Sequence, residues 1–159
     1  MSTTALEAVR QAVTVDVPVE RAFDVFTAEM GSWWPLETHH IGEQAAATAV
    51  VEPRAGGRWF ERAADGSECD WGRVLAWEPP TRVMFAWHLD AEWGFDPDPA
   101  HASEVEIRFI PEGDATTRVE LEHRGIERHG AGAVTIRDAV SGPGGWSGLL
   151  DLYKEATAA

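Results

Sequence analysis

The chain has 159 residues, 44% hydrophobic and 25% charged, which is the length and balance of one globular domain. Its net charge of −14 argues against nucleic acid as a partner, because a phosphate backbone is bound by clustered cations. One cysteine, Cys69, excludes an internal disulfide framework, and no apolar run approaches the ~20 residues of a membrane span, so we expect a cytoplasmic protein without membrane insertion.

The first predicted elements are a strand and an amphipathic helix. Residues 8–17 alternate and are rich in β-branched side chains, which predicts a strand. Pro18 then starts a helix, predicted to Gly31, whose apolar positions recur at helical spacing: Val19, Ala22, Phe23, Phe26 and Met30. The segment SWWP that follows predicts a short second helical turn.

From residue 47 the pattern changes to strands separated by turn signals such as Asp65-Gly66 and Pro79-Pro80-Thr81. The predicted strands are 47–53, 58–64, 68–78, 82–90, 103–111 and 116–124. The last two alternate cleanly, which predicts one solvated face and one covered face. We expect the cover to be a C-terminal helix with Trp146, Leu149, Leu150 and Tyr153 on one stripe, and Pro143 to break any longer helix that begins near Val134.

These elements predict an α+β helix-grip fold in one domain over residues 1–159, with a core at about 8–156. In such a fold a curved antiparallel sheet of six to seven strands wraps a long C-terminal helix, here in the order β-α-α-β(6)-α. Particular sequence runs sharpen this expectation: WWP followed by His, EPRAGGRWFER, DWGRVLAWEPPTRVMFAW, ELEHRG and the late GW. In these runs, from about Ala8 to Tyr153, the chain resembles the Activator-of-Hsp90-ATPase-homologue-1-like (AHSA1-like) family of the START/Bet v 1-like (SRPBCC) superfamily.

The resemblance implies a cavity between the sheet and the long helix, since members of that superfamily include lipid carriers, hormone receptors, polyketide cyclases and cochaperone domains. It extends only to the C-terminal domain of the eukaryotic cochaperone, which weighs against a chaperone-activating role. Fold alone does not fix function.

The histidines are the first candidates for chemistry. His39 and His40 are adjacent, so on an extended segment they point to opposite sides and do not chelate one metal; further ligands would have to come from His88, His123, Glu52, Glu61 or Cys69. We therefore predict no metal and no cofactor, and a half-exposed loop position for His39.

His123 follows Val119 and Leu121 on the covered face of its strand. It is either a buried structural histidine or a polar anchor or general base at the end of the cavity. His88 is out of phase with Phe85, Trp87 and Leu89 on its strand and is predicted to face outward.

The eight tryptophans indicate a ligand, because flat rings around a groove grip an aromatic or otherwise hydrophobic molecule by stacking. A tryptophan-rich packing core is the alternative. The candidate ligand-binding residues are Trp33, Trp34, His39, Trp59, Trp71, Phe85, Trp87, Leu89, Phe109, Leu121, His123, Trp146, Leu149, Leu150 and Tyr153. The sequence leaves the inward or outward direction of Trp59 and Trp71 open.

Evidence for catalysis in the sequence is thin. It contains no GxSxG elbow, no Cys-His motif and no nucleotide fingerprint. Glu52, Glu61 and Asp70 could supply an acid or a base, but on so acidic a chain we expect them to be solvated surface residues. The prediction is therefore a small hydrophobic or aromatic ligand-binding protein, monomer or homodimer, without assigned chemistry. The alternatives are a cavity enzyme of the polyketide cyclase or hydrolase kind, with His123 or His39 moving the proton, and a stress-related or cochaperone-like protein-interaction module.

Overall fold

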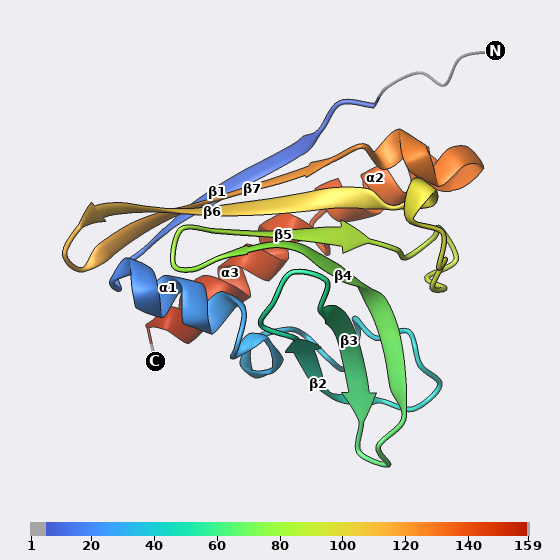
Figure 1. Ribbon diagram of the computed structural model, residues 1–159, viewed down its shortest axis with the longest axis horizontal. Helices are drawn as coiled ribbons and strands as arrows, with labels where there is room; N and C mark the ends of the chain where they lie inside the picture. The colour runs from blue at the N-terminus through green and yellow to red at the C-terminus, as the bar shows by residue number, and fades with distance from the viewer. Residues whose placement is uncertain (1–5, 159) are drawn as a thin grey trace.

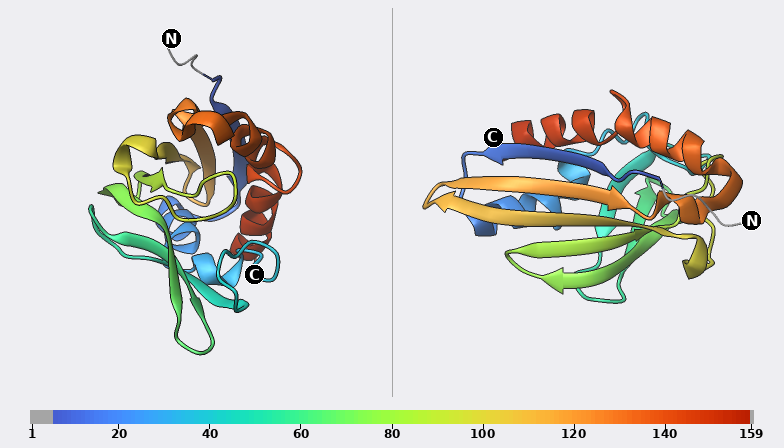
Figure 2. Two further views of the ribbon diagram at one scale, coloured as in Figure 1. Left: turned by 90° about the vertical axis from the view of Figure 1, so that its right-hand side faces the viewer. Right: turned by 90° about the horizontal axis from the view of Figure 1, so that it is seen from above.

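The computed structural model describes residues 6–158, which form one curled antiparallel sheet gripping a bent C-terminal helix (Figures 1 and 2). The strands are β1 (Val9–Val15), β2 (Ala46–Val51), β3 (Arg58–Ala63), β4 (Glu68–Glu78), β5 (Arg82–Trp87), β6 (Ser103–Gly113) and β7 (Thr116–Arg124). The helices are α1 (Val19–Phe26), α2 (Ala133–Ser141) and α3 (Trp146–Thr157), with 3-10 turns at Met30–Ser32, Pro99–His101 and Ile126–Gly132. The helix-grip prediction is confirmed.

The seven strands lie in the order β1-β7-β6-β5-β4-β3-β2, so the first strand joins the sheet beside the last. Cross-strand pairs such as Ile107 with Leu121 place apolar side chains on the concave face. α3 lies across this face, where Tyr153 donates its hydroxyl proton to the Ala22 carbonyl of α1 at 2.7 Å (Figure 2). The core therefore lies between the sheet and two helices far apart in sequence.

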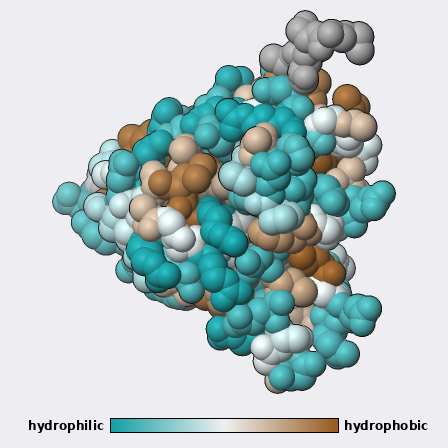
Figure 3. Space-filling view, turned by 45° about the vertical axis from the view of Figure 1, so that its right-hand side comes forward, coloured by the Kyte–Doolittle hydropathy of each residue, from teal (hydrophilic) through white to brown (hydrophobic). Residues whose placement is uncertain are grey.

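The convex face is polar, as the alternation of β6 and β7 predicts, but one acid on it is buried. Glu106 pairs with Arg82, Arg108 and Arg124 from three strands. Although burial opposes ionisation, hydrogen bonds from Arg82 and Arg124 lower the pKa of Glu106 from its ordinary 4.5 to about 2. Figure 3 shows a predominantly hydrophilic surface with small separate hydrophobic patches.

The ends of several elements differ from the sequence prediction. α1 ends at Phe26 rather than near Met30, because the backbone leaves the helical register there: Glu29 N–H donates to the Asp24 carbonyl five residues back, and a 3-10 turn begins at Met30. β5 ends at Trp87 rather than at residue 90, where the chain leaves the sheet for the loop 88–102. None of the helices within residues 6–158 is long and apolar enough to cross a membrane.

The C-terminal helix is broken, as the glycines around Pro143 predict. α2 stops at Ser141 and α3 starts at Trp146, and residues 142–145 between them form a bend. A Cβ atom on Gly145 would lie 2.1 Å from the Val140 carbonyl oxygen, so only glycine fits that close approach. The bend places Gly144 and Gly145 beside the mouth of a cavity.

Candidate functional site

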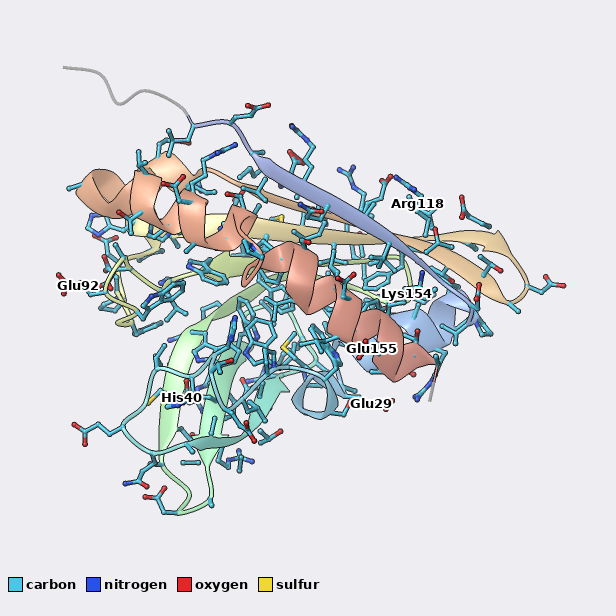
Figure 4. The ribbon with its side chains drawn as sticks, turned by 180° about the vertical axis from the view of Figure 1, so that it is seen from behind. Glu29, His40, Glu92, Arg118, Lys154 and Glu155 are labelled. Atoms are coloured by element: carbon cyan, nitrogen blue, oxygen red, sulfur yellow. The ribbon has the colours of Figure 1, made fainter. Side chains whose placement is uncertain are left out.

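A cavity of about 370 Å³ opens between the concave face of the sheet, the segment 34–41 and the helix bend. Its lining is mostly aromatic and aliphatic: Trp34, Thr38, His39, His40, Ile41, Trp71, Trp87, Leu89, Trp93, Ala139, Val140, Gly144, Gly145, Trp146 and Leu149. In Figure 4, His40 and Glu92 mark the segment 34–41 and the loop 88–102 that flank the opening. The cavity thus brings together four parts of the chain.

Five tryptophans form its walls. The Trp34 ring lies 5.0 Å from that of Trp71, tilted by 36°, and 6.2 Å from that of Trp146. Trp87 meets Trp146 edge-on at 5.8 Å and Trp93 at 6.4 Å. The rings form one continuous cluster, and such offset and edge-to-face contacts stabilise it beyond the area that it buries.

Four of these five indole N–H groups are already bonded within the protein. Trp34 donates to the His39 carbonyl at 3.0 Å, and Trp87 donates to the Leu89 carbonyl at 3.1 Å. Trp71 donates to Glu61 Oε1 at 2.8 Å, and Trp146 donates to His123 Nδ1 at 3.0 Å. The walls therefore offer a ligand ring faces and edges rather than hydrogen bonds.

Polar groups gather on one side of the mouth. His39 Nε2 lies 2.7 Å from the Gly144 carbonyl oxygen, which can only accept, so this nitrogen carries the proton. Its Nδ1 then accepts from the Thr38 hydroxyl at 2.8 Å. His40 Nδ1 lies 2.9 Å from the Gly42 carbonyl oxygen. The contact with Gly144 fastens the segment 38–42 to the helix bend, and the other two contacts hold the segment's own shape. Together they leave a polar edge beside an otherwise apolar cavity.

A buried carboxylate holds this segment from below. Glu61 on β3 is only 2% exposed. Besides the Trp71 indole, it accepts the backbone N–H of Ile41 at 2.6 Å and that of Gly42 at 3.2 Å. One side chain thus ties a cavity wall to the cavity rim. The sequence interpretation of Glu61 as a solvated surface acid is wrong, because three N–H donors compensate its desolvation.

Trp93 stands at the rim in an unusual backbone conformation. Its φ is 62°, in the left-handed region, and its side chain is 44% exposed. The Asp90 carboxylate accepts the backbone N–H groups of Glu92 and Gly94, both at 2.9 Å, which holds the turn. A large exposed apolar ring held in a strained turn over a cavity is typical of a functional position.

Behind the wall, His123 is fully buried in a chain of hydrogen bonds. Its Nδ1 accepts from Trp146, and its Nε2 lies 2.7 Å from Ser103 Oγ. Ser103 Oγ also lies 2.8 Å from Nε2 of the half-buried His129. Burial, with a smaller contribution from His129, lowers the pKa of His123 from its ordinary 6.5 to about 3. His123 is therefore neutral at physiological pH.

Comparison with known proteins assigns the chain to a protein family. The model of the Activator of Hsp90 ATPase homologue 1-like protein family matches residues 16–152. The chain belongs to that family. No curated protein sequence matches the chain.

Solved structures of related proteins extend the comparison. The chain is similar to an anthrahydroquino-γ-pyrone synthase, Txn09, solved in complex with SUM, with 40% identity, coverage of 95% of this chain and 97% of that one, and a TM-score of 0.67. CalC from Micromonospora echinospora, a self-sacrificing resistance protein, shares 28% identity over 94% of this chain and 93% of its own, with a TM-score of 0.70. Protein NE0264 from Nitrosomonas europaea, at 14% identity, 95% and 94% coverage and a TM-score of 0.63, shares the fold.

The structure divides the candidate ligand residues into two groups. Seven line the cavity: Trp34, His39, Trp71, Trp87, Leu89, Trp146 and Leu149. The other eight are buried in the core behind it: Trp33, Trp59, Phe85, Phe109, Leu121, His123, Leu150 and Tyr153. Trp59 and Trp71 both lie on the concave side, which settles the direction that the sequence left open.

Further lining residues were missed by sequence reasoning. Trp93 lies in a loop rich in Asp and Pro, where no periodicity marks a side chain as inward. Its one signal is a bulky ring between Glu92 and Gly94 in a polar loop. Ala139 and Val140 reach the cavity only because the helix bends after them. Thr38, His40 and Ile41 flank the predicted His39 on the same segment.

Two further expectations change in detail. His88, directly after β5, faces the outer side of the sheet as predicted. It is nevertheless only 4% exposed, because the loop that follows folds over it and Phe95 stacks on its ring at 5.3 Å. Asp70 and Glu52 form surface contacts with Arg58, through its side chain and its backbone N–H respectively. Within residues 6–158 no group of three His, Cys, Asp or Glu side chains could hold a metal ion.

Proposed function

We propose that the protein binds an uncharged, planar, polycyclic aromatic molecule in the tryptophan-walled cavity. The observation that carries this proposal is the set of five tryptophans lining a cavity of about 370 Å³, with four indole N–H groups bonded elsewhere. Ligand cavities of small-molecule binding proteins start at roughly 300 Å³, so the space suits a few fused rings.

The charge of the lining supports a neutral ligand. Among residues 6–158, no Asp, Glu, Lys or Arg lines the cavity, although these residue types make up 25% of the chain. The polar groups that do face it, on Thr38, His39 and His40, lie together at the mouth. A ligand with hydroxyl or keto groups along one edge would place that edge there and its carbon rings against the tryptophans.

The relatives support the same class of ligand. The relative with 40% identity is named as an anthrahydroquino-γ-pyrone synthase, whose name describes a fused-ring aromatic compound, and the relative with 28% identity is a resistance protein. We propose that this chain binds a small molecule of related shape rather than nucleic acid, since its net charge of −14 repels phosphates. A monomer or homodimer in the cytoplasm is part of the same proposal.

The second candidate is a cyclase that uses the same cavity. It is favoured by the 40% identity with a synthase and by His39 at the cavity mouth, whose Nε2–H is held by the Gly144 carbonyl and whose Nδ1 is the basic nitrogen of the ring. In this reading the neutral His39 acts as a general base: its Nδ1, released from the Thr38 hydroxyl, takes a proton from one ligand group and returns it to a ligand carbonyl. His123 is less suited to this role, because Trp87 and Trp146 stand beside it and it does not line the cavity.

The test is a titration of the protein with 1,8-dihydroxyanthraquinone, followed by quenching of tryptophan fluorescence and by calorimetry. We expect saturable one-to-one binding that Trp87→Ala abolishes and Trp77→Ala, at the far end of the core beside Phe23, leaves intact. Equal binding by the two variants would overturn the cavity assignment. Turnover of an aromatic polyketide precursor, lost in His39→Ala with binding retained, would instead establish the cyclase.

A further inference from the structure

The hydrogen bonds that run from the cavity wall through His123 have only one consistent direction. An indole N–H can only donate, so His123 Nδ1 accepts from Trp146 and the proton of the neutral ring sits on Nε2. That Nε2–H donates to Ser103 Oγ, and the single Ser103 proton is then directed to His129 Nε2. Each group therefore fixes the orientation of the next.

The relay, defined as Trp146, His123, Ser103 and His129, joins two different environments. At its inner end the Trp146 ring forms part of the cavity wall. His123 and Ser103 are both fully buried, while His129 at the outer end is half-buried and lines a surface hollow. A change of protonation at the surface thus has a direct path to a ring in the ligand cavity.

We propose that His123 and Ser103 are positioning residues for Trp146 and that they couple ligand affinity to the protonation of His129. The proposal rests on the proposed function, because it assumes that the ligand contacts the Trp146 ring. It adds a specific element to that function: the wall is held in its binding orientation only while His129 Nε2 accepts the Ser103 proton.

Protonation of His129 disrupts this arrangement. A protonated His129 carries a donor on Nε2, so Ser103 Oγ faces two N–H donors and its own proton has no acceptor in the relay. Leaving a fully buried hydroxyl proton unsatisfied is costly, so the side chains rearrange. Rearrangement of Ser103 changes the partner of His123 and, through it, the support of Trp146.

The groups around His129 set the pH range in which it takes up a proton. Burial lowers its pKa below the ordinary 6.5; Asp96 and Asp90 oppose this, and His88 and His101 add to it. Its own segment contributes Glu127 and Arg128. The titratable and charged groups around it are therefore His123, His88, Asp90, Asp96, His101, Glu127 and Arg128. We expect the coupling to emerge as the pH falls below about 6.5.

The first test needs no ligand. In the full-length, ligand-free protein, nitrogen-15 NMR should report a neutral His123 with its proton on Nε2 at pH 7.5 and an indole N–H of Trp146 shifted by its bond to nitrogen. A proton on Nδ1 of His123 would overturn the relay. Because no probe is involved, this result is independent of whether the cavity binds aromatic molecules.

The second test compares affinities for 1,8-dihydroxyanthraquinone at pH 7.5 and pH 5.5. His129→Gln keeps an acceptor oxygen for Ser103 but cannot titrate, whereas His101→Gln removes a nearby exposed histidine outside the relay. Between pH 7.5 and pH 5.5, we expect the affinity of wild type and of His101→Gln to fall by about threefold more than the affinity of His129→Gln. A loss of this size corresponds to one hydrogen bond. The comparison cancels every pH effect that arises in the rest of the chain, which all three proteins share.

Equal pH dependence in wild type and His129→Gln would overturn the coupling while leaving the cavity assignment intact. Failure of every protein to bind the probe at pH 7.5 would instead count against the proposed function, and the NMR result would still decide the relay. Ser103→Ala provides a further check, since it cuts the relay but preserves the bond between His123 and Trp146. We expect it to show the pH dependence of His129→Gln.

Discussion

Glu61 Oε1 on β3 lies 2.8 Å from the indole Nε1 of Trp71 on the neighbouring strand β4. The same carboxylate receives the backbone of Ile41 and Gly42, so a wall and the rim of the cavity share one buried anion. The cavity is thus supported by a buried acid that is not itself part of the lining.

Removing the Glu61 carboxylate should loosen both the Trp71 wall and the rim segment at Ile41 and Gly42. Glu61→Ala leaves three N–H donors without their acceptor and should cost about 3 kcal/mol of stability, measured by urea unfolding. Glu61→Gln keeps one acceptor oxygen and should cost less. Glu68→Ala on β4, an exposed partner of Arg62, serves as a control and should leave the unfolding midpoint unchanged. Equal midpoints for Glu61→Ala and wild type would contradict the role assigned to this carboxylate.

Substitution of Trp93 should weaken ligand binding while leaving the stability of the fold almost unchanged. Its left-handed backbone favours glycine, so Trp93→Gly relieves local strain and should change the free energy of unfolding by no more than about 1 kcal/mol. Loss of one stacking ring should weaken binding of 1,8-dihydroxyanthraquinone by about threefold to tenfold in calorimetry. Leu75→Ala, an exposed residue outside the cavity, is the control and should bind normally. Unchanged affinity in Trp93→Gly would remove Trp93 from the site.

Two neighbouring glycines at the helix bend should respond differently to alanine. A Cβ on Gly145 would meet the Val140 carbonyl oxygen at 2.1 Å, so Gly145→Ala should shift the bend and cost about 1–3 kcal/mol. A Cβ on Gly144 meets nothing within 4 Å, so Gly144→Ala should leave the melting temperature almost unchanged. Equal melting temperatures for the two variants would show that the bend tolerates the close approach.

Stability should fall in mild acid because of His123. Its pKa is about 3 in the folded protein and about 6.5 unfolded, so between these values the unfolded chain binds the extra proton and folding weakens as the pH falls. The expected slope from His123 is about 1.4 kcal/mol per pH unit. It should dominate above pH 4.5, because the depressed pKa of Glu106 contributes only below its ordinary value of 4.5.

Other histidines modify that slope. His129, with a lowered pKa, acts in the same direction, whereas the hydrogen bond from His101 to Asp96 raises the pKa of His101 and opposes it. The difference between wild type and His123→Gln in urea unfolding from pH 7 to pH 4.5 isolates His123. A parallel pH dependence in the two proteins would contradict its buried, neutral state.

The fold could be predicted from sequence to a greater depth than the site. Alternation in β6 and β7 placed Val105, Ile107 and His123 on the covered face correctly, because one wet side imposes a period of two. The glycines around Pro143 marked the helix bend, because proline and glycine end a helix through their own backbone properties. Such signals depend on neighbours in the chain.

The cavity depends on neighbours in space. Strand alternation placed Phe109 inside, the stripe of the C-terminal helix placed Tyr153 there and the family resemblance placed Trp33 there. None of these signals distinguished a core position from a lining position, since both are buried. The burial of Glu61 depends on backbone N–H groups about 20 residues away, and the exposed Trp93 sits in a loop without periodicity. Long-range polar contacts and loop geometry leave no periodic trace in the sequence.

Binding of an aromatic ligand against the five cavity tryptophans is tested most directly by a proton-nitrogen NMR spectrum of the indole N–H groups, recorded with and without 1,8-dihydroxyanthraquinone. Each of the eight tryptophans supplies one signal. Binding in the cavity predicts large changes at Trp34, Trp71, Trp87, Trp93 and Trp146 and none at Trp77, which lies outside the cavity. Saturable binding that leaves those five signals in place, or that shifts the Trp77 signal instead, would contradict ligand binding in this cavity.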